Sequence, residues 1–390
     1  MNQDYVKLKD CCVSIADGDH QSLPKADAGV PFITIANIDN FNTIDFTDTM
    51  YVPLSYYDKL DDKRKAQKND ILYSVVGSFG KPVFITNNTQ FVFQRHIAIL
   101  RPDTKMLCPR FLYYTMLTRE FYGKADAVAI GAAQRTISLK SLRDLAICLP
   151  NLNKQKRIVD ILEPYDELIK CNRQQIKLLE EAAQRLYKEW FEDLHFPGYE
   201  NTPIVDGVPE GWTKKKLVDI VDVLYGYAFD GTLFNSNHIG MPILRIRNIP
   251  IGQTDDYTTE KADPKYIIQN GDIVVGMDGE FHINSWGGSP AYLVQRSCCF
   301  RPHNANMKGF LIQAIRGPIK FYENTVVGAT VSHLGKKHID KIEILCSPKD
   351  MYEPFQTLFE KRQVLINQNR NLLEARDLLL PRLMSGEITV

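Results

Sequence analysis

The sequence lacks any long apolar run, and its first ten residues, MNQDYVKLKD, are polar. A helix that crosses a membrane needs about 20 mostly apolar residues, so we expect no membrane segment. A secretory signal needs an apolar stretch behind its start, so we expect no signal peptide and a cytoplasmic location. With 390 residues, of which 44% are hydrophobic, the chain is long enough for two or three packed domains.

Metal-binding and catalytic motifs are also missing. The eight cysteines form no Cys-x-x-Cys pair and the eight histidines no His-x-x-x-His pair, so we expect reduced thiols and no metal site. The sequence contains no phosphate-binding loop, no dinucleotide-binding glycine pattern and no Gly-x-Ser-x-Gly motif. The Asp/Asn-Pro-Pro-aromatic motif of amino-methyltransferases and a common nuclease pattern are absent as well. These absences predict a chain that is not an enzyme by itself and has no cofactor of its own.

A surplus of positive charge is the third missing feature, because 47 Lys and Arg residues balance 47 Asp and Glu residues. Proteins that bind DNA alone usually have a basic surplus to contact phosphates. If this chain binds DNA, its positive charge must be concentrated on one surface, or partner proteins must supply it.

What the sequence does contain is an internal repeat with a period of about 200 residues. Seven short matches occur in the same order in both halves. They pair 8–10 with 217–219, 31–38 with 242–249, 69–72 with 271–274, 94–95 with 295–296, 101–102 with 301–302, Gly131 with Gly328, and 145–150 with 342–348. A conserved order of weak matches indicates a duplicated domain.

Each half has a globular part followed by a helical part. The globular parts hold short β-branched and aromatic runs bounded by Gly, Asn, Asp and Pro, which predicts mixed, mostly β domains. The sequence therefore predicts an α+β protein with domains at 1–150 and 197–347, each followed by a helical segment, at 151–196 and 348–390.

The helical segments carry apolar residues three or four positions apart, the pattern of a coiled-coil seam. Its predicted members are Ile158, Ile161, Leu168, Asn172, Ile176, Leu179 and Leu186 in the first helix, and Phe355, Leu358, Leu365, Asn369, Leu373 and Leu380 in the second. The two asparagines occupy equivalent repeat positions. They either fix the register from within the seam or lie at its edge in water. Pro164 predicts a kink or an initial turn in the first helix, and Ser347 is the expected N-cap of the second.

Several loops share glycines between the halves but differ in polar side chains. Gln and Arg can read base edges, while Lys and main-chain amides can bind phosphates. The candidate DNA-binding residues are Asn37, Ser78, Lys81, Gln134, Arg135, Arg245, Arg247, Asn248, His282, Ser332 and Lys336. The alternative for each is an ordinary solvated loop residue. Arg245 and Arg247 flank Ile246 in a strand-like pattern and form either a basic patch or a solvent face.

Four segments carry a family resemblance: LAICLPNLNKQKRIVDILEPYDELI, IEILCSPKDMYEPFQTLFEKRQVLI, GDIVVG and VPEGWTKKKLVDI. Together with the order of elements, they make the chain similar to specificity subunits of type I restriction–modification systems over nearly its whole length. The second helical segment departs from the family pattern, because MYEPFQTL has no counterpart of Gln155-Lys156-Arg157-Ile158.

The resemblance implies two target-recognition domains that each read half of a bipartite, asymmetric site on double-stranded DNA. The two helices would pack antiparallel as a coiled coil and set the unread spacing, with the halves related by a pseudo-two-fold axis. It also implies two DNA adenine methyltransferase (modification) subunits and restriction/translocase subunits as partners, which alone would hold S-adenosylmethionine, ATP and Mg. Three alternatives stay open here: a self-contained methyltransferase or nuclease, a coiled-coil scaffold that binds no DNA, and a specificity subunit of a related system with fused methylation and cleavage.

Overall fold

The computed structural model describes residues 5–18, 24–77, 79–131, 135–325 and 332–390. The chain forms two compact units. Unit 1 comprises Met1–Asp166 and Ala375–Val390, and unit 2 comprises Glu167–Glu374. Each unit therefore combines a globular domain with parts of both long helices. Among the described residues, no helix has the length and apolar character needed to cross a membrane.

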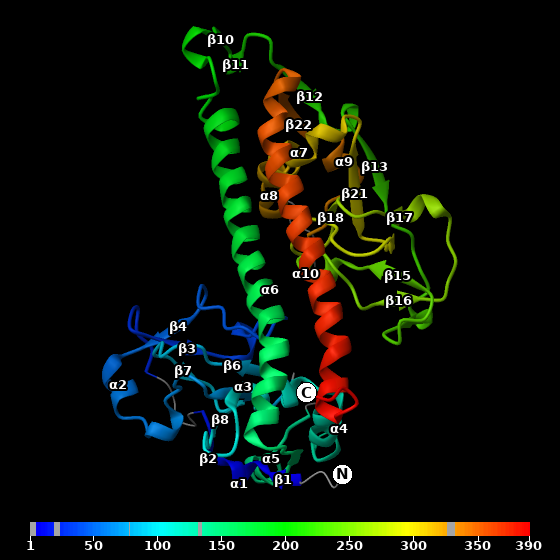
Figure 1. Ribbon diagram of the computed structural model, residues 1–390. Helices are drawn as coiled ribbons and strands as arrows, with labels where there is room; N and C mark the ends of the chain where they lie inside the picture. Colours follow the sequence, from blue (N-terminus) through cyan, green and yellow to red (C-terminus); the bar gives the residue numbers. More distant parts are fainter. Residues whose placement is uncertain (1–4, 19–23, 78, 132–134, 326–331) are drawn as a thin grey trace. The chain divides into compact units, whose positions relative to one another are not determined.

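Unit 1 is built around a four-stranded antiparallel sheet with the order β2-β8-β5-β6 (Figure 1). Its strands are β2 (Cys12–Asp17), β5 (Ile71–Ser74), β6 (Pro82–Phe84) and β8 (Ile97–Pro102). A second sheet, β4-β3-β7, contains β3 (Val30–Ile33), β4 (Met50–Val52) and β7 (Val92–Phe93), and β3 and β7 run parallel. The strands β1 (Tyr5–Lys7) and β9 (Ala146–Cys148) form a pair of their own. The short helices are α1 (Leu8–Cys11), α2 (Leu54–Asp58), α3 (Pro109–Leu117), α4 (Arg119–Ala127) and α5 (Leu139–Asp144).

Unit 2 repeats this topology and has two additional strands in its second sheet. Its four-stranded sheet has the order β13-β21-β18-β19, formed by β13 (Val221–Tyr225), β18 (Ile273–Gly276), β19 (Ile283–Ser285) and β21 (Ser297–Pro302). The second sheet, β14-β16-β15-β20-β17, contains β14 (Phe234–Asn235), β15 (Met241–Leu244), β16 (Tyr257–Thr258), β17 (Ile267–Ile268) and β20 (Ala291–Leu293), with β15 parallel to β20. Two further pairs are β12 (Thr213–Lys216) with β22 (Glu343–Cys346), and β10 (Ile204–Val205) with β11 (Val208–Pro209). The helices are α7 (Lys308–Ala314), α8 (Arg316–Thr325) and α9 (Lys336–Ile339).

Equivalent main-chain hydrogen bonds support most of the predicted repeat matches. The Leu8 N–H donates to the Leu145 carbonyl (2.9 Å), as the Leu217 N–H does to that of Ile342 (2.8 Å). Asn69 and Gly271 are matched positions, and both have positive φ, 76° and 82°.

The match of 94–95 with 295–296 is wrong by one residue. The Gln94 N–H donates to the Ile33 carbonyl, and the equivalent donor in unit 2 is Val294, which donates to Leu244. His96 therefore corresponds to Arg296. The dipeptide Gln-Arg occurs in both halves and produced the error. An identical dipeptide can align one position away from the structural match when the apolar residues of the flanking strands differ between the halves.

The first long helix, α6, spans Leu152–Tyr187 with Pro164 inside it, and a π-helical turn at Lys188–Glu192 extends it. The second, α10, spans Glu353–Ser385, follows a 3-10 turn at Lys349–Tyr352, and ends before Gly386, whose φ is 79°. The prediction of Ser347 as the N-cap of the second helix was wrong, because the 3-10 turn separates Ser347 from α10. The Ser347 carbonyl accepts a hydrogen bond from the Tyr352 hydroxyl (3.0 Å) instead.

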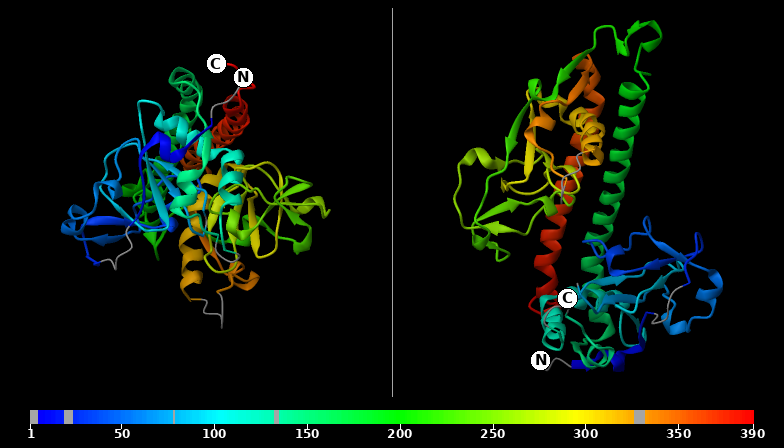
Figure 2. Two further views of the ribbon diagram at one scale, coloured as in Figure 1. Left: turned by 90° about the horizontal axis from the view of Figure 1, so that it is seen from below. Right: turned by 180° about the vertical axis from the view of Figure 1, so that it is seen from behind.

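The helix segments run antiparallel in unit 2, where they lie side by side (Figure 1 and Figure 2). Asn172 Nδ2 donates to Asn369 Oδ1 at 3.0 Å, and Arg362 Nε to Glu180 Oε1 at 2.7 Å, so the partner number falls as the first rises. In unit 1, Arg376 Nη1 contacts Asp166 Oδ1 at 2.8 Å.

Most predicted seam residues are covered. Ile158, Asn172, Phe355, Asn369 and Leu380 are buried, while Ile161, Ile176, Leu179, Leu186, Leu358, Leu365 and Leu373 are half-buried. Leu168 was wrong as a seam residue, because its side chain is 47% exposed whereas that of Ile169 is 6% exposed. The pairs Ile161-Leu162 and Leu168-Ile169 are both apolar, so two registers with three- and four-residue steps fit the sequence equally well.

Each unit has a large core between its four-stranded sheet and its helices. Tyr73, Phe111 and Phe121 are buried in the core of unit 1, and Phe300, Phe310 and Phe355 in that of unit 2. All eight cysteines are free thiols. Burial raises the pKa of Cys298 and Cys299 far above the ordinary value, so both stay protonated.

Candidate nucleic-acid interface

Three segments that are far apart in the sequence meet in each unit. In unit 1 the Val75 N–H donates to the His96 carbonyl (2.9 Å), and the Val75 carbonyl accepts from the Ile137 N–H (2.9 Å). In unit 2 the Met277 N–H donates to the Arg296 carbonyl (2.8 Å), and its carbonyl accepts from the Leu334 N–H (2.7 Å). We call these segments the frame: 75–77, 94–96 and 135–137 in unit 1, and 277–279, 294–296 and 332–334 in unit 2.

A further bond is equivalent in both frames. The Gly77 N–H donates to the Arg135 carbonyl at 3.0 Å, and the Gly279 N–H to the Ser332 carbonyl at 3.1 Å. The predicted loop pairs of both halves are therefore in contact through their main chains. The predicted residues Ser78 and Gln134 lie outside the described residues.

The frames carry different side chains at equivalent positions. Unit 1 has Val76 and Thr136, whereas unit 2 has Asp278 and His333, and each pair forms a β-bridge. Next to this bridge, unit 1 has His96, whose pKa is lowered by burial and by the charge of Arg95. Unit 2 has Arg296 there, so a weakly basic ring is replaced by a permanent cation.

Lys81 and His282 occupy equivalent places beside the frames. The Lys81 carbonyl accepts from the Ser74 N–H (3.1 Å), and the His282 carbonyl from the Gly276 N–H (2.9 Å). His282 Nε2 lies 3.3 Å from Glu280 Oε2. Both side chains are half-buried.

Arg135 and Lys336 have different surroundings. Arg135 Nη2 donates to the Asp126 carboxylate at 2.6 Å and to the Asp126 carbonyl at 2.5 Å, which ties the loop to α4. Lys336 is exposed at the first residue of α9, next to the frame of unit 2. Of these two cations, Arg135 has an acidic partner that a phosphate would have to replace.

Asn37 and Asn248 have a structural role in common. Oδ1 of Asn37 accepts from the Thr34 N–H, and Oδ1 of Asn248 from the Arg245 N–H, both at 2.9 Å. Each amide thus closes the 3-10 turn that follows a strand, Ile35–Asn37 or Ile246–Asn248. This shared bond accounts for the identity of the two residues between the halves.

The interpretation of Arg245 and Arg247 as two residues on one strand face was wrong. The strand β15 ends at Leu244, and Arg247 lies in the 3-10 turn. The Arg245 guanidinium stacks over Phe234 at 5.3 Å, whereas Arg247 Nε lies 3.2 Å from Asp256 Oδ2. The 3-10 turn that Asn248 closes ends the strand, so the side chains of Arg245 and Arg247 do not follow the alternating pattern of a strand.

A buried ion pair supports each four-stranded sheet, which the sequence did not predict. Arg101 Nη2 lies 2.9 Å from Asp70 Oδ2, and Arg301 Nη2 lies 2.7 Å from Asp272 Oδ2. Both aspartates are nearly fully buried, at 2% and 5% exposure. The signal was present, because both residues of each pair belong to matched repeat segments.

Gln155 of the family pattern joins α6 to the domain of unit 1. Its side chain is fully buried, accepts from the Cys108 N–H (2.7 Å), and donates to the carbonyls of Met106 (2.9 Å) and Pro150 (2.7 Å). In unit 2 the hydroxyl of Tyr352 donates to the Ser347 carbonyl at the equivalent place. Burial raises the pKa of Tyr352 to about 12, so the hydroxyl remains a donor. In the second half, the internal contact of Tyr352 therefore replaces those that Gln155 makes in the first half.

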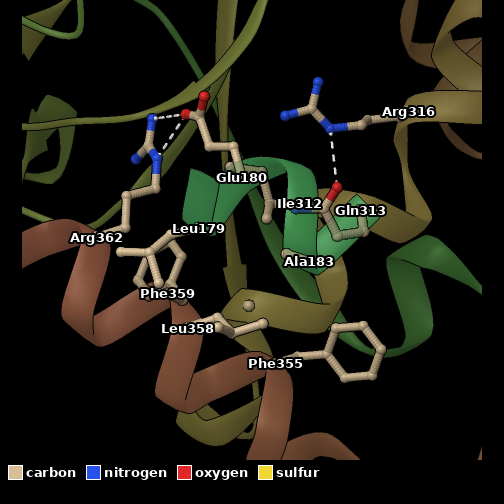
Figure 3. A pocket seen from close by; sticks show the side chains of 11 residues that line it. Leu179, Glu180, Ala183, Ile312, Gln313, Arg316, Phe355, Leu358, Phe359 and Arg362 are labelled. Carbon is tan, nitrogen blue, oxygen red and sulfur yellow. Dashed lines mark hydrogen bonds and ion pairs between the residues drawn. The ribbon is translucent and has the colours of Figure 1, made fainter. Parts of the chain in front are cut away.

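A small pocket in unit 2 lies between α6, α7, α8 and α10 (Figure 3). Its lining includes Leu179, Ile312, Phe355 and Phe359, with Arg316 among its polar members. The cavity volume of about 20 Å³ holds roughly one water molecule, so this pocket is too small for a nucleotide or other substrate. In the described part of the chain, no group of three or more His, Cys, Asp and Glu side chains is placed to hold a metal ion.

Comparison with known proteins adds a family to this geometry. The family model described as "Type I restriction modification DNA specificity domain" matches residues 3–181 and 209–353. A curated relative, the HindI specificity subunit of a type I restriction enzyme from Haemophilus influenzae, is 24% identical and covers 84% of this chain and 88% of its own length. The MjaIX specificity subunit from Methanocaldococcus jannaschii is 25% identical, covering 72% and 69%.

A solved structure supports the fold. The type I restriction–modification S subunit from M. genitalium superposes with a TM-score of 0.56 at 15% identity, over 100% of this chain and 97% of that one. At this identity the likeness concerns the fold alone.

Proposed function

The chain belongs to the type I restriction–modification DNA specificity family, and from this premise we propose that it reads a bipartite, asymmetric site on double-stranded DNA, one half-site for each unit. It is a DNA sequence-specificity subunit, a non-catalytic component of its complex. The long helices α6 and α10, which each contribute to both units, determine how many base pairs remain unread between the half-sites.

The observation that carries this proposal is the contrast between the two frames. Their main-chain hydrogen bonds are the same, but Val76, His96 and Thr136 stand where unit 2 has Asp278, Arg296 and His333. Base edges are distinguished by donor and acceptor side chains, while the scaffold only positions them. A duplicated scaffold with different polar side chains is what two different half-sites require. A scaffold protein that binds no DNA would give no reason for this difference.

Specificity subunits of type I systems bind DNA and assemble with methyltransferase and restriction subunits. For this chain we infer two DNA adenine methyltransferase subunits, which hold S-adenosylmethionine, and restriction/translocase subunits, which use ATP and Mg. The balance of 47 basic and 47 acidic residues supports this division of labour, because the partners then supply part of the phosphate contacts.

An exposed apolar stripe on α6 supports docking of such a partner in unit 2. Leu168 and Leu178 are 47% and 62% exposed, and Cys171 is exposed between them. Residues three and seven positions apart lie on one side of a helix, so these side chains form one stripe. We expect Leu178→Asp to prevent co-purification with the methyltransferase. Lys177→Gln, which changes the net charge by the same amount on another side of α6, should leave co-purification unchanged.

Sequencing of DNA methylation tests the function. Cells lacking other adenine methylation would express the cognate methyltransferase subunit with or without this chain. We expect a methylated bipartite adenine motif only when the chain is present. If the purified complex contains both proteins and no motif is methylated, the recognition function is refuted.

A further inference from the structure

We propose that Asp278 is a positioning residue that holds Arg296 and His333 as the base-reading pair of unit 2, and that the half-site of this unit contains a guanine. The inference rests on the proposed function and extends it to particular side chains.

The geometry places both basic side chains on one carboxylate. Arg296 Nη1 lies 2.9 Å from Asp278 Oδ2, and His333 Nδ1 lies 2.5 Å from Asp278 Oδ1. The Asp278 side chain is only 16% exposed, whereas those of Arg296 and His333 are 67% and 58% exposed. The Asp278 carboxylate is thus the covered centre of the cluster, and the side chains of Arg296 and His333 extend from it into solvent.

The carboxylate also determines which ring nitrogen of His333 faces outward. An ionised Asp only accepts hydrogen bonds, so Nδ1 must carry the hydrogen that contacts Asp278. Nε2 is then free of the carboxylate and, in a neutral ring, accepts a hydrogen bond. A base presents a suitable donor as the exocyclic amino group of adenine or cytosine.

Arg296 is held in an uncommon backbone conformation. Its φ of 67° lies in the left-handed region, which costs a non-glycine residue energy and persists only where the surroundings impose it. The equivalent His96 in unit 1 has no positive φ. Among the described residues, Asp278 is the one side chain that pairs with the Arg296 guanidinium. The remaining N–H groups are available for the two acceptors of guanine, O6 and N7, the commonest contact of arginine with a base.

Unit 1 provides an internal comparison for this cluster. Val76 stands in the place of Asp278 and cannot accept a hydrogen bond from a neighbouring cation. A purely structural ion pair would be expected in both units, as Asp70–Arg101 and Asp272–Arg301 are. An ordinary surface ion pair would not need to be held by three segments of the frame. A charged cluster confined to one frame is expected of residues that specify one half-site.

The test compares variants in the complete complex with the cognate methyltransferase. Arg296→Lys keeps the charge but loses the two-pronged contact. We expect a fall in methylation rate at the wild-type motif of roughly 5- to 150-fold, with relaxed preference at one guanine, and DNA affinity for unrelated sequence within about twofold. Asp278→Ala should relax the same half-site. Lys265→Ala, which breaks an exposed ion pair with Asp263 in the same unit, serves as the control and should change neither.

The outcomes separate this inference from the proposed function. A wild-type complex without any motif refutes the proposed function. A wild-type motif that both variants retain at the wild-type rate, or relaxation in the half-site read by unit 1, refutes the role of Asp278 and Arg296 alone. If Asp278→Ala fails to assemble, the exposed Arg296→Lys variant decides.

Discussion

The two units differ at their surfaces and at their helix junctions, while their four-stranded sheets and the main chains of their frames coincide. At the frame, equivalent N–H and carbonyl groups pair at 2.7–3.1 Å in both units, but the side chains that project from it have different charges. At the junction, unit 1 uses the three hydrogen bonds of Gln155, and unit 2 uses one from Tyr352 and a longer one, 3.3 Å, from the Gly309 N–H to Gln356 Oε1. The shared main-chain hydrogen bonds identify the scaffold. The side chains that differ identify the places where each unit has a function of its own.

Unit 2 compensates for its simpler junction farther along α10. Arg362 Nη2 donates to Asn284 Oδ1 (2.8 Å), and Gln363 Nε2 donates to the Trp286 carbonyl (2.9 Å). In unit 1 the helix contact is different: the Tyr114 hydroxyl donates to Asp166 at 2.7 Å. Burial and the Asp166 charge raise the pKa of Tyr114 well above its ordinary value, so this donor stays protonated.

The junctions give the largest expected difference between the units. Gln155→Leu leaves the Cys108 N–H and two carbonyls without partners, which should lower the stability of unit 1 by about 3 to 4 kcal/mol. Tyr352→Phe removes one hydrogen bond and should cost unit 2 about 1 kcal/mol. Hydrogen exchange, which reports the opening of each unit separately, measures both values. Equal losses of stability in the two units would show that their junctions do not differ in strength.

The buried ion pairs should show where the units are alike. Asp70→Asn and Asp272→Asn each leave an arginine without its carboxylate, so each should destabilise its own unit by roughly 2 to 3 kcal/mol. Asp263→Asn, in an exposed pair with Lys265, should leave the stability of unit 2 nearly unchanged. Hydrogen exchange again provides the measurement, and protection lost mainly in the other unit would contradict this account.

The asparagine pair lies at equivalent repeat positions on the two helices. Asn172→Leu leaves the Asn369 amide buried without its partner and should cost about 1 to 2 kcal/mol. The double variant Asn172→Leu, Asn369→Leu should regain this stability but lose the constraint on register, so the methylated motif should acquire more than one spacer length. Denaturation and methylation sequencing test the two effects. A double variant less stable than the single one, with one spacer length, would show that the pair does not fix the register.

The smallest effect is expected where the units differ in a phosphate-type contact. Lys81→Ala should weaken DNA binding by about 1 kcal/mol or less on all sequences and reduce the slope of log affinity against log salt by about 1. His282→Ala, at the equivalent place, should reduce this slope less, because His282 Nε2 already lies 3.3 Å from the Glu280 carboxylate. Salt titrations of the complete complex provide the comparison. A change in sequence preference with Lys81→Ala would instead assign this residue to base reading.

Patterns that extend over many residues were predictable from the sequence. The duplicated order of segments and the heptad-like stripe predicted two α+β domains and two long helices, since hydrophobic periodicity and repeat order do not depend on any one residue. Asn172 and Asn369 are buried and hydrogen-bonded to each other, so they do not lie in water at the edge of the seam.

Local choices between two allowed arrangements were not predictable. Leu168 and Ile169 fit the helix stripe equally well, and Arg245-Ile246-Arg247 fits a strand as well as the 3-10 turn that Asn248 closes. The cluster of Asp278, Arg296 and His333 was missed because its members come from three separate segments. They meet only in the folded frame, and no spacing of residues along the sequence indicates that contact. The DNA contacts of the candidate loop residues stay predictions.

We propose that each unit reads its own half-site independently. Exchange of residues 1–150 for the corresponding domain of another family member, in complex with the same methyltransferase, tests it most directly by methylation sequencing. We expect one half of the methylated motif to change while the other half and the spacer length stay the same. A motif that changes in both halves, or in neither, would contradict it.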